Sequence, residues 1–240
     1  MRAVKKMLPA YVFSILLTLF CTMFASQSVS ALSEAAPVWS PSDDPTVVLD
    51  PGHGGEDGGA VSPNGVRESK LNLSISLRTR DLLRFLGVSV VMTRETDVSI
   101  HNPEAGTISE KKVSDLKNRV RIVSEIPNAV LISVHQNMFA ESKYSGTQAF
   151  YAETEGSRSL AERLQALVAS GLEPSNHRQA KPCENVYLLS HITCPAVLVE
   201  CGFLSNPREE ALLQTAAYQK KLAAVIVAGL TVEAGGCKYK

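Results

Sequence analysis

A short β-branched run ends abruptly at a proline-glycine turn in the sequence TVVLDPGHGG, residues 46–55. A continuous apolar run without polar alternation is typical of a strand that is buried on both faces. Such strands occur mainly in α/β proteins, where crossover helices cover both sides of a parallel sheet. Residues 46–50 are therefore predicted to form the first strand of an α/β sheet.

Strand and helix patterns alternate along the rest of the chain. We predict further strands at 88–92, 129–134, 146–151, 186–189 and 196–199, and helices at about 69–86, 114–125, 157–172 and 216–233. Strands that alternate with helices favour an α/β fold. We expect a single domain with a mostly parallel or mixed twisted sheet and helices on both of its faces.

The length and composition suit one globular domain. The chain has 240 residues, of which 45% are hydrophobic and 20% are charged, with 24 basic and 24 acidic residues. These values exclude a disordered or multi-span membrane chain. Because three of the basic residues lie near the N-terminus, the remainder is mildly acidic. We expect no nucleic-acid partner, since such proteins carry a basic surface.

Residues 1–31 have the order of a secretory signal. Three basic residues precede an uncharged apolar stretch at 7–25, and small residues lead to Ala31. An uncleaved membrane anchor is the alternative, because a stretch of that length is about enough to span a bilayer. Residues 32–45 are predicted to be a linker, and 46–240 the catalytic domain. We expect export to the cell envelope, with membrane contact through the N-terminal segment only.

The body of the chain contains an even number of cysteines. Irregular spacing and the lack of a C-x-x-C pair argue against a metal knuckle. An exported chain permits disulfides, whereas buried free thiols are the simpler interpretation. The sequence leaves the disulfide state open for Cys183, Cys194, Cys201 and Cys237.

Polar residues follow three of the predicted buried strands. His53 comes just after the first strand, and His135 and Glu200 directly follow the third and the sixth. The carboxyl ends of strands form the ligand crevice in open α/β sheets, so we expect these side chains to converge. Glu68, at the start of the first predicted helix, faces the same edge and suits a helix N-terminus electrostatically.

Histidine and carboxylate side chains at one edge point to metal chemistry. Two histidines and a carboxylate are a common ligand set for catalytic zinc, with the fourth position left for water. Zinc lowers the pKa of such a water toward about 7, and a glutamate that is not a ligand can accept its proton. The glycine-rich loop 51–59 lets the backbone approach a metal closely, and it lacks the motifs of a phosphate-binding loop. Each residue alone has a simpler interpretation, as a solvated histidine or a helix cap.

The chain resembles the zinc-dependent N-acetylmuramoyl-L-alanine amidases in four motifs that keep their order and spacing: Leu49–Gly55, Glu68, Ser133–Asn137 and Val199–Asn206. The similarity runs from about Thr46 to Leu230. The short length, the export segment and Met92–Asp97 are most like the germination-specific branch, which helps to make muramic-δ-lactam in the spore cortex.

The resemblance implies a role for each matching residue. Zinc would have three ligands: His53, Glu68 and His135. Glu200 would be the general acid/base, and Asn137, in the family's S-x-H-x-N pattern, would help to line the substrate cleft. The sequence departs from the commonest form at Gln136 and Met138, where small or aliphatic residues are usual.

The implied reaction is hydrolysis of the amide between muramic acid and L-alanine of the peptidoglycan stem peptide. Spore-cortex maturation is the implied duty, with the forespore intermembrane space as one compartment. A vegetative autolysin of the same activity is the alternative, as is a zinc peptidase or deacetylase. A silent or partner-dependent peptidoglycan-binding protein is a further alternative, although an intact Glu200 disfavours the silent form.

The chain has no wall-binding repeats, so a protein partner for localisation or activation is expected. The polar segment 93–112 is the predicted cleft wall or partner surface, because it is long for a connection.

Overall fold

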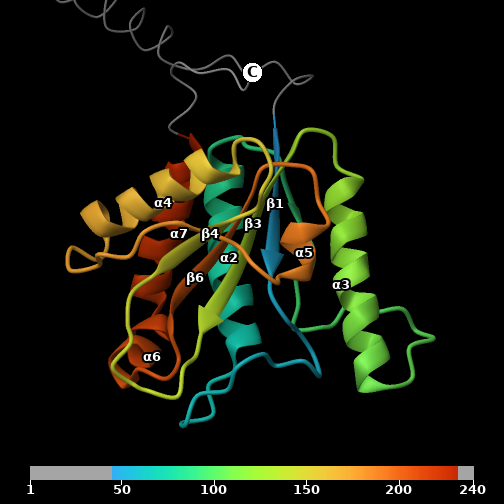
Figure 1. The fold of residues 1–240 in the computed structure, drawn as a ribbon, viewed down its shortest axis with the longest axis horizontal. Helices are drawn as coiled ribbons and strands as arrows, with labels where there is room; N and C mark the ends of the chain where they lie inside the picture. The colour runs from blue at the N-terminus through green and yellow to red at the C-terminus, as the bar shows by residue number, and fades with distance from the viewer. Residues whose placement is uncertain (1–44, 232–240) are drawn as a thin grey trace, which may run out of the picture. The chain divides into compact units, whose positions relative to one another are not determined.

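The computed structural model describes residues 45–231, and within that range it contains a six-stranded sheet (Figure 1). The strand order is β2-β1-β3-β6-β4-β5. All neighbouring strands run parallel except β4 and β6, which are antiparallel, so the sheet is mixed. The strands are β1 (Thr46–Pro51), β2 (Val90–Met92), β3 (Ala129–Asn137), β4 (Gln148–Tyr151), β5 (Lys181–Pro182) and β6 (Ala196–Phe203).

Helices cover both faces of this sheet, as Figure 1 shows. The helices of one face, whose side chains share the larger apolar cluster, are α2 (Glu68–Phe85), α4 (Ser157–Gly171) and α7 (Ala216–Thr231). The opposite face carries α3 (Ile108–Ser124) and the short α5 (Tyr187–Ser190). Helix α6 (Pro207–Leu213) follows β6 at the carboxyl edge of the parallel strands. The predicted α/β class, with one domain from β1 to α7, is confirmed.

The central strands explain why the sheet has two covered faces. Val48 and Leu49 of β1 are both fully buried, and they belong to the two different apolar clusters. Successive side chains of a strand point to opposite faces, so a run without polar residues buries both. This arrangement brings the carboxyl ends of β1, β3 and β6 to one edge of the sheet.

Two sequence predictions about single elements differ from the structure. The predicted strand at 186–189 is wrong, because Tyr187–Ser190 form a helical turn whose Leu188 and Leu189 pack into the core. Four apolar residues are too few for a period to separate strand from helix. Helix α3 begins at Ile108 rather than near 114, so it takes up the end of the predicted loop 93–112.

Other predictions fall partly outside the described range. The export segment 1–31, residues 32–44 of the linker and Cys237 are not among the described residues. Within 45–231, no helix has the length and apolar character needed to cross a bilayer. Cys183, Cys194 and Cys201 are free thiols.

Candidate metal centre

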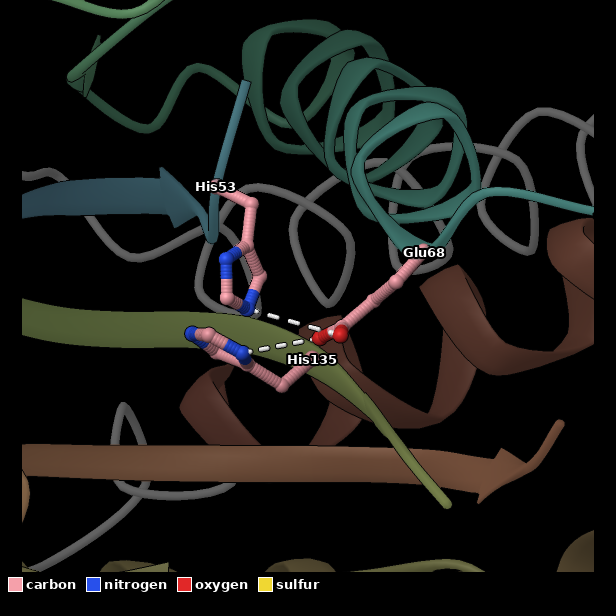
Figure 2. A group of neighbouring side chains, drawn as sticks. All are labelled: His53, Glu68 and His135. Carbon is pink, nitrogen blue, oxygen red and sulfur yellow. Dashed lines mark hydrogen bonds and ion pairs between the residues drawn. The ribbon is translucent and has the colours of Figure 1, made fainter. Parts of the chain in front are cut away.

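Three elements bring His53, Glu68 and His135 together, as Figure 2 shows. His53 lies in the loop after β1, Glu68 is the first residue of α2, and His135 lies near the end of β3. One potential ligand atom from each residue lies within 4.8 Å of the others. The Glu68 carboxylate contacts both rings, with Oε2 3.4 Å from Nε2 of His53 and Oε1 3.0 Å from Nδ1 of His135.

The Glu68 carboxylate is buried and held in place by the backbone. Its residue is 3% exposed, and its oxygens accept hydrogen bonds from the N–H groups of Ala60 at 2.8 Å and Gln136 at 3.1 Å. Asn72, one turn further along α2, donates its amide at 3.3 Å. Burial raises the pKa of Glu68, but the hydrogen bonds from His135 and His53 outweigh it and the net pKa is lowered. Glu68 is therefore a carboxylate, as a metal ligand requires.

His53 has a strained backbone and a fixed ring. Its φ of 60° lies in the left-handed region, which residues other than glycine rarely adopt. Nδ1 lies 3.0 Å from Oδ2 of Asp57, and this contact directs Nε2 toward Glu68. Burial lowers the pKa of His53, but hydrogen bonds to Asp57 and Glu68 raise it to about 9. A metal that binds Nε2 would displace a proton from this ring.

Two positions near the site need glycine, because candidate ligand side chains fill the space that a Cβ would take. A Cβ at Gly52 would overlap the imidazole of His135. A Cβ at Gly59, where φ is 65°, would lie 2.5 Å from Oε2 of Glu68. The loop therefore needs glycine both where candidate ligand side chains approach the backbone closely and where the chain turns.

Glu200 lies beside His135, on the neighbouring strand. The two residues are direct partners in the register of β3 and β6. Oε2 of Glu200 is buried and has no hydrogen-bond partner among the described residues, which is rare for a carboxylate in a folded protein. Burial raises the pKa of Glu200 to about 7, against the attraction of His135. The next residue, Cys201, packs into the larger apolar cluster, on the other face of the strand from Glu200, as the strand period predicts.

Two buried arginines support the loop that carries His53. Arg94 and Arg119 donate to the carbonyl groups of residues 51–53, at 2.8 to 3.0 Å. Their charge is balanced by Asp50, 2.6 Å from Arg119, and by Asp115, 2.5 Å from Arg119. We did not predict these supports. Of the residues that support His53, Asp57 lies in the glycine-rich loop and Arg94 lies in Met92–Asp97, two stretches already singled out in the sequence. Arg119 lies in the middle of α3, and the only sequence feature that marks it is its (i, i+4) spacing from Asp115.

Asn137 lies at the edge of this centre. It ends β3, is partly exposed, and its carbonyl accepts the N–H of Leu204 at 2.8 Å. Within residues 45–231 its side chain has no hydrogen bond, so its contact with substrate stays a prediction.

The donor set as a whole fits a catalytic zinc ion. It consists of two imidazole nitrogens and a carboxylate oxygen, with an unpartnered carboxylate beside them.

Comparisons with known proteins agree with this geometry. A family model described as N-acetylmuramoyl-L-alanine amidase matches residues 47–232. The germination-specific N-acetylmuramoyl-L-alanine amidase of Bacillus subtilis is 37% identical over 223 residues, which cover 91% of this chain and 90% of that protein.

Solved structures show the same fold. The CwlD amidase of Clostridioides difficile, in complex with the GerS lipoprotein, is 38% identical with a TM-score of 0.76, covering 78% of this chain and 96% of that one. The catalytic domain of CwlV, an N-acetylmuramoyl-L-alanine amidase of Bacillus (Paenibacillus) polymyxa, is 30% identical with a TM-score of 0.66, covering 78% and 96%.

Proposed function

The chain belongs to the N-acetylmuramoyl-L-alanine amidase family, and from that membership we propose how its own residues act. The protein hydrolyses the amide that joins N-acetylmuramic acid to L-alanine of the peptidoglycan stem peptide. Three side chains would hold a zinc ion: His53, Glu68 and His135. Bound there, the ion would supply a Lewis acid and a water of lowered pKa.

Glu200 moves the proton in this proposal. Its pKa of about 7 lets the carboxyl group both accept and release a proton near neutral pH. It accepts a proton from the attacking water and returns it to the alanine amine, which is a poor leaving group as an anion. The unpartnered Oε2 of Glu200 beside His135 is the observation that carries this assignment, because a buried carboxylate oxygen without a role would be costly.

Metal removal and restoration test the reaction. The purified protein is stripped with a chelator, zinc is added back, and peptidoglycan digests are analysed by mass spectrometry. We expect zinc to restore the release of free stem peptides that begin with L-alanine, while glycan strands stay uncut. Release of peptides cut at another bond would instead identify a peptidase, and a product without its acetyl group a deacetylase.

A single substitution separates metal binding from proton transfer. Glu200→Gln should keep zinc and lower the turnover number about 10²- to 10⁴-fold, because the amide cannot accept the proton. Glu184→Gln, an exposed acid on the chain between β5 and α5, is the matched control and should retain activity. Substantial turnover by Glu200→Gln would remove Glu200 from this role.

The biological duty is proposed from the germination-specific relative, which aligns with nine tenths of this chain. We infer a role in spore-cortex maturation, outside the cytoplasm, with residues 1–31 as the export segment or anchor. The lipoprotein bound to the C. difficile amidase suggests that a protein partner assists this chain also.

A gene deletion tests the proposed role. Deletion of the gene should remove muramic-δ-lactam from spore cortex digests. Normal lactam with altered vegetative walls would favour an autolysin.

A further inference from the structure

A cavity of about 580 Å³ is lined by segments that follow β6, the strand of Glu200, and precede its neighbour β4. Its lining comes from residues 145–146 before β4, residues 172–178 after α4, residues 206–212 around α6, and Tyr218 of α7. The proposed reaction uses none of these residues, so the cavity is unexplained by it.

Arg178 connects this cavity to the part of the sheet that carries Glu200. Its Nη1 donates to Gln148 at 2.9 Å, and Gln148 lies directly opposite Glu200 in the register of β4 and β6. The Arg178 guanidinium also covers the ring of Phe203, 4.7 Å from the centroid, at the end of β6. Neighbouring strands lie about 4.8 Å apart, so a single residue of β4, Gln148, links Glu200 to Arg178. An extended peptide advances about 3.3 to 3.6 Å per residue, so one that passes Glu200 toward β4 would span this separation in a few residues.

The acidic side chains of the cavity are already used by the protein. Glu173 accepts four hydrogen bonds of 2.6 to 2.9 Å, from the backbone and hydroxyl of Thr147, from Asn176 and from Tyr218. A carboxylate offers about four lone-pair sites, so Glu173 has none left. Each oxygen of Glu209 accepts a backbone N–H at 2.7 Å. These carboxylates hold loops together and are poor sites for a cationic ligand.

The basic side chains, in contrast, keep free donors. Across the part of the chain that the structure describes, the side chains of Arg208 and His177 make no hydrogen bond or ion pair, and both residues are exposed. Arg178 uses Nε and Nη1 but leaves Nη2 free. Guanidinium groups match the planar geometry of a carboxylate and can donate to both of its oxygens.

We propose that this cavity binds a carboxylate group of the stem peptide, with Arg208 and Arg178 as its donors. The inference rests on the proposed function, because it needs a peptide that extends from the reacting amide past Glu200. It assigns the protein a preference for acidic stem peptides.

Binding without turnover tests this preference. Two synthetic peptides that begin with L-alanine, one with free carboxylates and one with every carboxylate amidated, are titrated into the purified protein by calorimetry. We expect tighter binding of the free-acid peptide. Arg208→Ala should weaken that binding about two- to fivefold, the range for an exposed ion pair, and leave the amidated peptide unchanged.

Two further variants keep the result interpretable. Arg158→Ala removes an exposed arginine of α4 that pairs with Glu162 at 2.8 Å, away from the cavity, and should change neither affinity. Arg208→Lys keeps the charge but loses the two-pronged donor and should fall between wild type and Arg208→Ala.

Three outcomes would overturn the inference: no preference by the wild-type protein, an equal loss for both peptides in Arg208→Ala, or no binding of either peptide. A failure of the proposed function is observed separately, as a lack of zinc-dependent peptide release from intact peptidoglycan.

Discussion

His53 combines an unfavourable backbone conformation with two contacts that stabilise it. A left-handed residue other than glycine costs about 1 to 3 kcal/mol and persists where its surroundings fix it. Here Arg119 holds the carbonyl at 2.8 Å and Asp57 holds the ring nitrogen at 3.0 Å. Carboxylate partners of this kind fix the tautomer and orientation of a metal-binding histidine.

Asp57→Asn should therefore lower zinc affinity. An amide is a weaker acceptor and can present its NH₂ group to the ring, so Nε2 is no longer reliably free. We expect a loss of about 10- to 100-fold, the usual range for such a partner. Competition with a chelator of known affinity measures it in the purified protein.

Glu56→Gln is the matched control for Asp57→Asn. Glu56 is the preceding residue, pairs with Lys111 at 2.9 Å, and does not contact either histidine. The control should keep its zinc affinity. Equal losses in the two variants would show that the loop charge matters and the hydrogen bond does not.

Residue identities at the centre followed from the sequence, but their supports did not. His53, Glu68, His135 and Glu200 stand at strand ends or a helix start, positions that periodicity locates. Their role as ligands and base stays a prediction until the experiments above are made. The arginine that holds His53 lies 66 positions further along the chain, and no local pattern reports a contact of that range.

Among the elements, α3 shows how a helix start can be missed. Apart from the exposed Ile108, its first turn is polar and none of it is buried, so apolar periodicity places the start too late. A capping box was nevertheless present in the sequence. Thr107 accepts the N–H of Glu110 at 3.2 Å, and Glu110 accepts the N–H of Thr107 at 2.9 Å. The T-x-x-E spacing that we overlooked gives the correct start.

Thr107→Ala should destabilise the protein through this helix. The N–H of Glu110 loses its hydroxyl acceptor, which lowers the free energy of unfolding by about 1 kcal/mol. Urea denaturation measures the change. Thr107→Ser retains the hydroxyl and should stay close to wild type. A wild-type unfolding curve for Thr107→Ala would contradict a stabilising role for the cap.

At the scale of the whole molecule, one buried network of charged and hydroxyl side chains connects several elements around Asp50 of β1. Asp50 accepts from Arg119 at 2.6 Å, and from Thr93 and Ser133 at 2.7 Å. The network thus links β1 to α3, to β3 and to the residue after β2. Burial raises the pKa of Asp50, but Arg119 and the two hydroxyl groups outweigh it and the net pKa is lowered.

The lowered pKa of Asp50 makes a pH-dependent contribution to stability. With a pKa below its unfolded value of about 4, Asp50 stabilises the fold above that pH and loses this effect as the pH falls. Asp50→Asn leaves the buried Arg119 with one fewer charged partner and should cost about 3 kcal/mol at pH 7. The difference from wild type should shrink below about pH 4.

Urea denaturation at pH 7, 5, 4 and 3 checks both parts. Asp81→Asn, which removes an exposed acid that pairs with Arg80 at 2.7 Å, is the control and should cost little at any pH. A difference between Asp50→Asn and wild type that does not change with pH would exclude the charge of Asp50 as its cause.

Local patterns in the sequence were enough to predict the α/β class, the buried first strand, the glycine-rich loop and the residue types of the candidate metal centre. Each depends on a period or spacing within about one element, which the chain itself displays. Four features depend on contacts between distant elements: the strand order, the ring nitrogen that each histidine presents, the unpartnered oxygen of Glu200, and the free donors of the cavity arginines. Those contacts form only when the whole core packs, so only the tertiary structure decides them.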